Sequence, residues 1–512
     1  MIVHTNDQHA QIRPSAVPGH EAAVGGTLAI SAWVEALEEV WGEERVLVLD
    51  AGDLRSGTPL DEYVVDGVRG GAMLNLLEVV GYDAWTVGNH EFDKGLEETA
   101  TFVAASPIPA LAVNLDGPDG RPVFPNLGAT EVLDAAGVRV AVIGVTTPSL
   151  TRYVNEDLAG LVVADPAASV RGELGRLPED VDVVVALSHL GLEDDRALAV
   201  AVPELDLIVG GHSHTRMEEA ERIGDTWIVQ AGCCSRGFGV SVLTPSPEGT
   251  VDLDYRLVEP DPDVLPARPS PETREFVAQW ESTLNKDWGV VLGENLFGSL
   301  TREGTAESTL GRWVCETLRR AAGADLGLYN GSGLRANIPM GLVSRETLYN
   351  VFPFGNEMVV ATVSGGDLVS LAIRNATAVA DPESGYVMEQ DGLAYTWRRH
   401  LGAAELVKIS VNGEPVDRDA TYTVATNSFV ARQWSRYVGG APQEVRATGR
   451  RVRDIVEERI RAEGIISVST LLAACGVPSA SRLRATRGPL ASKRPSGWSV
   501  SAFARLRIAV GG

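Results

Sequence analysis

The chain is poor in cysteine, with only four residues in 512: Cys233, Cys234, Cys315 and Cys475. Neither their number nor their spacing matches a disulfide framework or a cysteine-based zinc motif. The sequence therefore excludes a disulfide-rich scaffold, and its cysteines do not indicate a compartment.

Long apolar runs are also missing. No segment has about 18 consecutive apolar residues, so we expect no transmembrane helix. We expect no signal peptide either, because the residues from Ile2 to Asn6 already fit a strand of the fold. Two alternatives follow: the protein is cytoplasmic, or its true start lies upstream of Met1.

Basic residues are outnumbered, with 44 Lys and Arg against 69 Asp and Glu and a net charge of −25. A nucleic-acid-binding protein would present a basic face, so we expect no nucleic-acid polymer as partner. A small anionic substrate is still compatible, because bound divalent cations can reverse the sign of a local site.

The first 260 residues alternate short apolar runs with helical stretches. Each run is rich in β-branched residues and bounded by Gly, Asp or Asn, which is typical of buried strands in an α/β domain. The runs are 46–49, 84–87, 140–143, 181–187 and 207–209.

The remainder divides into three parts. Residues 261–289 combine a proline-rich connector with a helix expected over 271–287. A second α/β region is expected over 290–464. Residues 465–512 form a basic tail that we expect to be poorly ordered, because from Ser481 it has seven Lys or Arg and no acidic residue.

Polar residues follow the apolar strands at their carboxyl ends, where open α/β sheets place ligands. The segments are His4-Thr5-Asn6-Asp7-Gln8-His9, Asp50-Ala51-Gly52-Asp53, Gly88-Asn89-His90-Glu91-Phe92-Asp93, Ser188-His189 and Gly210-Gly211-His212-Ser213-His214. A single histidine at a strand end is usually structural, and we interpret His4 in that way. Five such segments together predict a metal site, and mixed carboxylate and imidazole ligands suit Zn, Mn, Fe or Co.

These motifs resemble the calcineurin-like metallophosphoesterase superfamily and, in their longer forms, its 5′-nucleotidase family, which includes UDP-sugar hydrolases. The resemblance covers roughly residues 1–464. It implies a four-layer α/β/β/α metallophosphoesterase domain over residues 1–260, followed by a smaller α/β substrate-binding domain. It also implies an extracytoplasmic location if the true start lies upstream.

Carried over residue by residue, the resemblance implies two divalent metal ions. It assigns Asp7, His9 and His214 to one ion, Asn89, His189 and His212 to the other, and Asp53 to a bridging position. It implies that His90, oriented by Asp93, is catalytic and not a ligand. The implied reaction is direct attack of a metal-bound water on phosphorus, as two-metal sites perform.

The second region has two motifs, Tyr329-Asn330-Gly331-Ser332-Gly333-Leu334-Arg335 and Val351-Phe352-Pro353-Phe354-Gly355-Asn356-Glu357. They resemble the 5′-nucleotidase carboxyl-terminal domain. The resemblance implies that Arg335 binds phosphate or carboxylate, that Phe354 stacks on the base, and that Asn330 and Asn356 bind the nucleoside.

The second region also departs from the family pattern in two places. Many members have arginine where this chain has Ala306, and Arg302 or Arg312 are candidates to replace it. A Gly-Gly-Asp-Gly segment is replaced by Gln433-Trp434-Ser435-Arg436-Tyr437, in which Tyr437 is the candidate second stacking ring.

We therefore predict hydrolysis of 5′-nucleotides, a small-molecule substrate. Three alternatives use the same machinery: 2′,3′-cyclic nucleotides, UDP-sugars, or another phosphate or sulfur ester. An alternative of another class is a non-catalytic binding protein. The complete ligand set and the His90–Asp93 pair argue against it.

Overall fold

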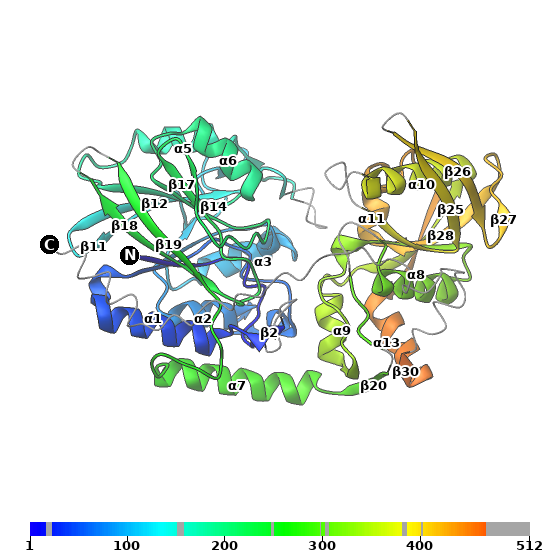
Figure 1. Ribbon diagram of the computed structural model, residues 1–512, viewed down its shortest axis with the longest axis horizontal. Coiled ribbons are helices and arrows are strands. Elements are labelled where there is room, and N and C mark those ends of the chain that lie inside the picture. Colours follow the sequence, from blue (N-terminus) through cyan, green and yellow to red (C-terminus); the bar gives the residue numbers. More distant parts are fainter. Residues whose placement is uncertain are drawn as a thin grey trace, which may run out of the picture. The chain divides into compact units, whose positions relative to one another are not determined.

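The computed structural model describes residues 1–16, 23–150, 158–246, 250–296, 298–302, 307–380, 387–400 and 403–466 (Figure 1). Ala306 and nearly all of the basic tail lie outside these ranges. The chain divides into two compact units, with the boundary between Thr283 and Leu284. No helix among the described residues is both long and apolar enough to cross a membrane.

The first unit is built on two mixed sheets. The first sheet has the order β10 (Leu127–Gly128), β8 (Ala110–Leu111), β7 (Ala84–Thr86), β4 (Leu47–Asp50), β1 (Ile2–Thr5), β18 (Phe238–Pro245) and β19 (Val251–Val258). The second has the order β11 (Thr130–Ala135), β12 (Val138–Thr146), β14 (Val183–His189), β15 (Leu207–Gly210), β17 (Thr226–Val229) and β16 (Glu221–Ile223).

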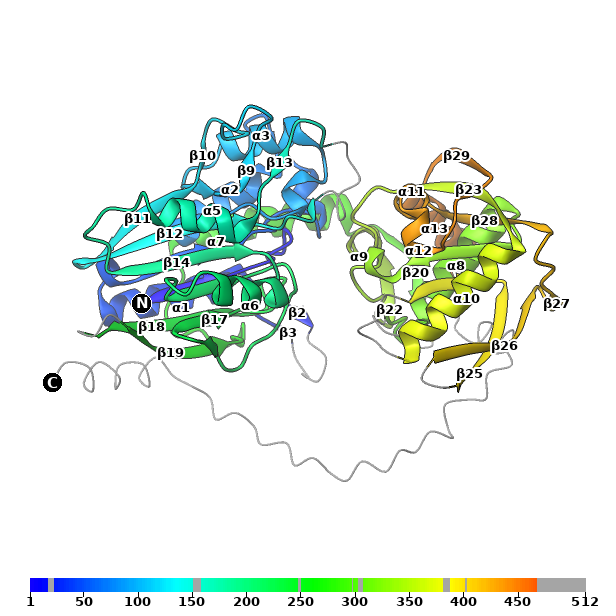
Figure 2. The ribbon, with the colours of Figure 1, turned by 90° about the horizontal axis from the view of Figure 1, so that it is seen from above.

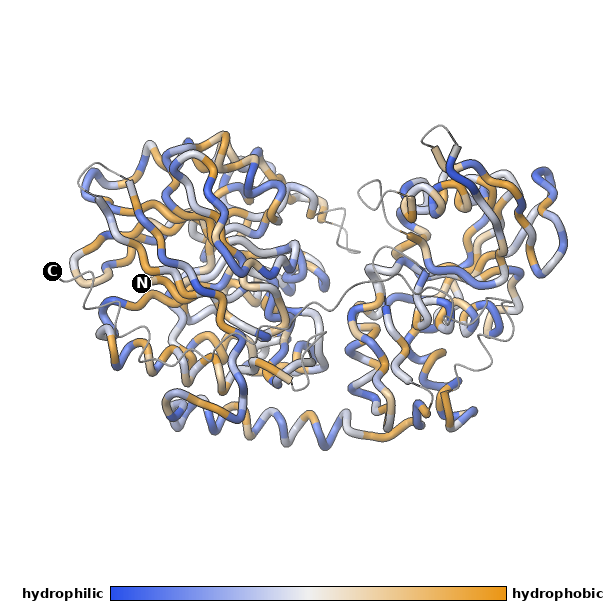
Figure 3. The backbone as a smooth tube through the Cα atoms, in the orientation of Figure 1, coloured by the Kyte–Doolittle hydropathy of each residue, from blue (hydrophilic) through white to orange (hydrophobic). Residues whose placement is uncertain are grey.

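The two sheets pack face to face because alternate residues of their strands point into a common apolar core. In β12, Val140 and Val142 join a core that also contains Leu47 and Leu49 of the first sheet. The intervening face of the second sheet packs on helices, because Ile143 shares a separate core with Leu198. Successive strand residues point to opposite faces, so one strand serves both layers. Figure 3 shows the apolar character of these central strands.

Helices cover the two outer faces of this sandwich. Helices α5 (Pro166–Leu174) and α6 (Leu192–Ala201) lie over the second sheet (Figures 1 and 2). Helices α1 (Thr27–Trp41) and α2 (Gly71–Val80) lie on the opposite side (Figure 1). The first unit therefore has the expected α/β/β/α layer order.

Shorter elements decorate the first unit. They are β2 (Ser15–Ala16), β3 (Ala23–Val24), η1 (Glu43–Arg45), η2 (Pro59–Glu62), β5 (Val64–Val65), β6 (Val68–Arg69), η3 (His90–Phe92), α3 (Leu96–Ala104), β9 (Leu115–Asp116) and β13 (Val162–Val163). Helix α7 (Pro271–Trp288) begins at a proline, as expected at a first helical position. The boundary between the units falls inside α7, within the expected connector segment 261–289.

The second unit contains a five-stranded sheet with the order β24 (Met388–Asp391), β21 (Leu326–Asn330), β28 (Thr421–Asn427), β23 (Glu357–Ser364) and β29 (Glu444–Arg451). One face packs on α8 (Thr309–Ala322) and α13 (Val452–Glu463) through a core around Trp313. The other packs on α10 (Gly365–Ala380) and α12 (Trp434–Tyr437) through a core around Trp434.

Two small sheets complete the second unit. They are β22 (Gly341–Ser344), β20 (Val291–Asn295) and β30 (Ile465–Ile466), and β25 (Leu393–His400), β26 (Ala403–Val411) and β27 (Glu414–Pro415). The remaining helices are η4 (Gly331–Gly333), α9 (Arg345–Val351) and α11 (Ser428–Arg432). The unit is thus an α/β domain whose central strands β21 and β28 run parallel.

Candidate metal centre

The polar segments predicted from the sequence lie at the ends of adjacent parallel strands. Strands β1, β4 and β7 are neighbours in the first sheet, and β14 and β15 are neighbours in the second. Parallel neighbours end at the same sheet edge, so their following loops converge. This topology brings residues more than 200 positions apart in the sequence within hydrogen-bonding distance of each other.

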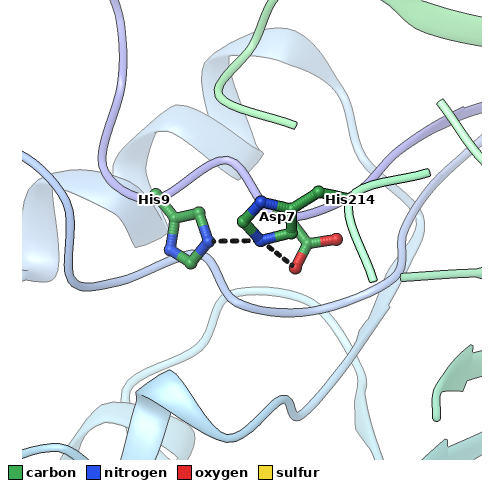
Figure 4. Close-up of side chains that lie close together, drawn as sticks. All are labelled: Asp7, His9 and His214. Atoms are coloured by element: carbon green, nitrogen blue, oxygen red, sulfur yellow. Dashed lines mark hydrogen bonds and ion pairs between the residues drawn. The ribbon is translucent and has the colours of Figure 1, made fainter. Parts of the chain in front are cut away.

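The first ligand cluster consists of Asp7, His9 and His214. The Nε2 atoms of His9 and His214 lie 3.0 Å apart, and His214 Nε2 lies 3.3 Å from Asp7 Oδ1 (Figure 4). His9 Nδ1 faces the backbone oxygen of Arg55 at 3.1 Å, so its Nε2 is the atom directed to the cluster.

The second cluster consists of Asp53, His189 and His212. His189 Nε2 lies 3.1 Å from Asp53 Oδ2, while its Nδ1 faces the Ala51 carbonyl at 2.6 Å. Asp53 also groups with His9 and His90, so it is common to both sides of the site. Its carboxylate therefore lies close to histidines of both clusters.

Asn89 provides an independent test of whether these residues fit a cation. Its side-chain oxygen is buried and accepts no hydrogen bond from any described residue. An unsatisfied buried oxygen costs free energy unless another group binds it. Because the residue follows β7, beside Gly88 at the Asp53 loop, a cation is a suitable partner for this oxygen.

The charges at the site also favour a cation. Burial alone would raise the pKa of Asp53, but His189 and His90 hold it well below the usual value. Burial alone would lower the pKa of His189, but Asp53 and Asp7 raise it. The carboxylates therefore stabilise positive charge here, and a divalent cation would supply it while the imidazoles stay neutral.

His90 and Asp93 form the expected pair beside the cluster. His90 Nδ1 lies 2.7 Å from Asp93 Oδ2, so the opposite nitrogen, Nε2, faces the site 3.9 Å from Asp53 Oδ2. The His90 backbone N–H also donates to Asp53 Oδ1 at 2.8 Å. Asp93 thus fixes the orientation of the ring, as an orienting carboxylate does.

The backbone of the ligand loops is strained. Asp7, His9, Asp53, His212 and His214 all have positive φ, between 51° and 70°. Residues other than glycine rarely adopt this left-handed region, and each costs about 1–3 kcal/mol unless surrounding contacts hold it. Five of the seven predicted ligands share this conformation, which is typical of a functional site.

Glu91 is a residue of this site that the sequence motifs did not single out. Its fully buried carboxylate accepts backbone N–H groups from Gly88 at 2.7 Å, Leu54 at 2.9 Å, Asp53 at 3.2 Å and Arg55 at 3.3 Å. It therefore ties the loop that carries Asn89 to the loop that carries Asp53. No sequence pattern could show this role, because the acceptors and donors meet only after folding.

Glycine is required where the two loops meet. A Cβ atom on Gly88 would lie 2.2 Å from Asp53 Oδ1, and one on Gly211 would lie 2.6 Å from the Ala51 oxygen. The ligand loops are thus packed directly against one another.

Asn6 is a second supporting residue of the site to which the sequence analysis gave no role, since it donates to Asp7 Oδ2 at 2.6 Å.

In the second unit, Asn330 and Asn356 are both buried. Asn330 donates to Ser332 Oγ at 3.0 Å and accepts from Asn427 Nδ2 at 2.8 Å. Asn356 accepts from Ser428 Oγ at 3.3 Å. These amides hold neighbouring turns together, so their predicted contact with a nucleoside stays a prediction.

Arg335 and Phe354 lie together, with the guanidinium carbon 5.8 Å from the ring centroid, and both are half-buried. Tyr437 belongs to the core around Trp434, and its ring lies 6.0 Å from that of Phe429. The structure thus places Phe354 beside the predicted anion-binding arginine, and Tyr437 is only 8% exposed.

The two candidate replacements for the missing arginine differ. Arg302 donates to the backbone oxygen of Arg335 at 2.9 Å, so it lies next to the predicted anion-binding residue. Arg312 pairs with Glu307 at 3.0 Å. This geometry favours Arg302 over Arg312. Ala306 itself lies outside the described residues.

Comparison with protein families gives two matches. The family described as calcineurin-like phosphoesterase matches residues 1–216, and the family described as 5′-nucleotidase, C-terminal domain, matches residues 289–439. The first match lies within the predicted residues 1–260, and the second begins at residue 289 and ends before residue 464.

Individual proteins show the same similarity. The trifunctional nucleotide phosphoesterase protein YfkN of Bacillus subtilis is 28% identical over 84% of this chain, but the chain spans only 31% of that relative. A probable 5′-nucleotidase of Treponema pallidum is 27% identical, with 84% of this chain and 86% of the relative covered. The crystal structure of a 5′-nucleotidase precursor from Thermus thermophilus superposes with a TM-score of 0.77 at 26% identity, covering 91% of this chain and 97% of the other.

Proposed function

Since this chain belongs to the 5′-nucleotidase family of calcineurin-like phosphoesterases, we propose that it hydrolyses 5′-nucleotides to nucleosides and phosphate. Asp53 carries the proposal, because its carboxylate belongs to the second ligand cluster and also groups with His9 of the first cluster and with His90. A carboxylate between two cations reduces their mutual repulsion and fixes their spacing.

We assign two divalent cations to the centre. Asp7, His9 and His214 would hold one of them, Asn89, His189 and His212 the other, and Asp53 both. When bound, such a pair activates water and neutralises the oxygens of a phosphoryl group. Imidazole, amide and carboxylate donors suit Zn, Mn, Fe or Co.

His90 and Asp93 act on the phosphoryl group and on the leaving oxygen of the substrate. His90 directs Nε2 toward the site while Asp93 accepts a hydrogen bond from Nδ1. As an imidazolium, His90 would stabilise the charge that develops on the phosphoryl oxygens, or would donate its Nε2 proton to the leaving oxygen. Release of the nucleoside alcohol then needs no covalent intermediate with the protein.

The second unit supplies substrate recognition in this proposal. Arg335 binds an anionic group with its planar guanidinium, which fits phosphate or carboxylate in a two-pronged geometry. Phe354, half-buried next to Arg335, offers a face on which a base stacks. Tyr437 is assigned the second ring, with Asn330 and Asn356 on the nucleoside.

A phosphate-release panel tests this function directly. Purified protein loaded separately with Zn, Mn, Fe and Co is assayed with 5′-nucleotides, 2′,3′-cyclic nucleotides, nucleotide sugars and p-nitrophenyl phosphate. We expect the highest kcat/KM with a 5′-nucleotide and no turnover after chelation. Preference for a cyclic nucleotide or a nucleotide sugar would replace the substrate while keeping the chemistry. Full turnover by metal-free protein would refute the two-cation mechanism.

A further inference from the structure

Gln230 is a fully buried side chain that none of the motifs above includes. It follows β17, the strand next to β15 in the second sheet. The segment after it runs antiparallel to the end of the histidine loop, where Arg216 bridges to Ala231. The Gln230 amide therefore faces the loop that carries His212 and His214.

The amide bonds to alternate residues of that loop. Gln230 Nε2 donates to the Gly211 carbonyl at 2.9 Å, and Oε1 accepts from Ser213 Oγ at 3.0 Å and from the Thr215 backbone N–H. These three residues flank and separate the two histidines. A single side chain thus fixes the loop on both sides of each predicted ligand.

The loop needs such a restraint. His212 and His214 have φ of 70° and 55°, in the left-handed region that histidine rarely adopts. A conformation of this kind persists only where surrounding contacts determine it. The three hydrogen bonds of Gln230 satisfy donors and acceptors of the loop in this conformation and so help to hold it.

We infer that Gln230 is a positioning residue for both metal ions, an inference that rests on the proposed function. His214 belongs to the first ligand cluster and His212 to the second. Loosening their common loop therefore weakens both sites at once. Gly211 has little room to shift toward Ala51, because a β-carbon at this position would lie 2.6 Å from the Ala51 oxygen and 3.3 Å from Asp7 Oδ2.

The test measures metal affinity and not only activity. In Gln230→Met, the side chain keeps its length and loses all three hydrogen bonds. We expect the affinity for both ions to fall by about 10–100-fold, the usual cost of removing a group that orients metal ligands. Affinity is measured by competition with a chelator and elemental analysis, and the melting temperature of the metal-free protein is recorded alongside.

Gln390→Met is the matched control, since Gln390 is a buried glutamine of the second unit that donates to Glu307 and accepts from the Leu393 N–H. It should leave metal affinity unchanged. Ser213→Ala, at an exposed residue, removes one of the three Gln230 bonds together with the bonds of Ser213 Oγ to the Leu192 N–H and the Thr215 hydroxyl. It should lower affinity several-fold, so it decides the question if Gln230→Met does not fold.

Wild-type metal affinity in a folded Gln230→Met, or in Ser213→Ala when that variant decides, would overturn the inference. The proposed function fails in a different way. If the wild-type protein binds two ions but releases phosphate from no ester, the nucleotidase proposal is wrong. Reduced metal affinity in Gln230→Met would then still support the positioning role.

Discussion

Backbone conformation distinguishes the metal centre from the candidate substrate residues. Twelve non-glycine residues of the described chain have positive φ, and only Asn412 of these is in the second unit. Nine of the other eleven lie in four loops at the metal centre: Asp7, His9, Ala10, Asp53, Ser56, His212, His214, Cys234 and Ser235. None of Asn330, Arg335, Phe354, Asn356 and Tyr437 is among the twelve.

This difference indicates two ways of building a site. In the first unit, the fold holds five predicted metal ligands in unfavourable backbone conformations. Their positions are therefore fixed before a metal ion or a substrate binds. In the second unit, the candidate residues have ordinary backbone, and the two asparagines among them bond to neighbouring residues, namely Ser332, Asn427 and Ser428. We therefore expect the first site to be sensitive to single changes and the second to affect substrate preference.

The largest effect should follow Asp53→Asn, which removes the shared charge of the metal centre. We expect loss of bound metal and a fall in kcat of at least about a thousandfold, since two-cation sites contribute several kcal/mol of transition-state stabilisation. Elemental analysis and steady-state kinetics measure both. Asp66→Asn is the control, because Asp66 has a φ of 50° but is exposed in the turn between β5 and β6. An equal effect in the control would show that the loss is not specific to the metal centre.

His90→Asn should come next and should separate chemistry from metal binding. We expect kcat to fall by about 10²–10⁴, the range for a positioned acid or base, with both ions retained. Metal content and kcat are measured on the same preparation. Loss of an ion with otherwise normal kcat would show that His90 is a ligand.

Phe354→Ala tests the unstrained side of the comparison. Stacking of one base on an aromatic ring contributes about 1–3 kcal/mol, so kcat/KM for a 5′-nucleotide should fall by roughly ten- to a hundredfold. The rate with p-nitrophenyl phosphate, which has no base, should change little. Parallel losses on both substrates with a lower melting temperature would show that Phe354 only packs in the core.

The smallest effect concerns the pH dependence of stability, for which we expect opposite signs from a buried residue of each unit. His4 is fully buried in β1 with neither ring nitrogen hydrogen-bonded, and burial lowers its pKa from 6.5 to about 3. The unfolded chain thus binds the proton more readily, so this contribution to stability is full above pH 6.5 and declines as pH falls. It should amount to about 2 kcal/mol lost at pH 5, and His4→Leu should remove that slope.

Glu389 in the second unit should have the opposite dependence. Burial raises its pKa from 4.5 to about 7, although Ser308 donates two hydrogen bonds to it. Its contribution is present below pH 4.5 and is lost as pH rises through 7, so Glu389→Gln should remove a slope of the other sign. Thermal unfolding of the wild type and both variants from pH 5 to 8 checks both predictions. Slopes of the same sign would contradict the assigned burial effects.

The family resemblance predicted the layered fold, and the polar segments at the strand ends predicted side chains that the folded chain brings together. A polar residue directly after an apolar strand is a local pattern that can be read from the sequence. Parallel neighbouring strands end at the same edge of a sheet, so such residues come together in the fold. Six of the seven predicted ligands, including Asp53 and His189, lie in the ligand clusters, and Asn89 follows the adjacent strand.

The supporting residues could not be predicted in the same way. Glu91 and Gln230 act on backbone groups of distant loops, and their donors and acceptors meet only in the folded chain. The predicted role of Tyr437 as a second stacking ring stays a prediction. An aromatic residue after a substituted motif has no local feature that separates a stacking ring from a core ring, and the Tyr437 ring lies 6.0 Å from that of Phe429.

The close approach of the loops at Gly88 and Gly211 has a consequence for how this site can change in evolution or in the laboratory. A single added carbon atom at Gly88 would collide with the Asp53 carboxylate, and one at Gly211 would collide with the Ala51 carbonyl. Neither position can therefore accept a larger residue unless the facing loop changes as well. Libraries that vary one ligand loop at a time should therefore return mostly metal-free proteins. New specificities are more accessible through the second unit, where side chains can be exchanged without remodelling the strained loops.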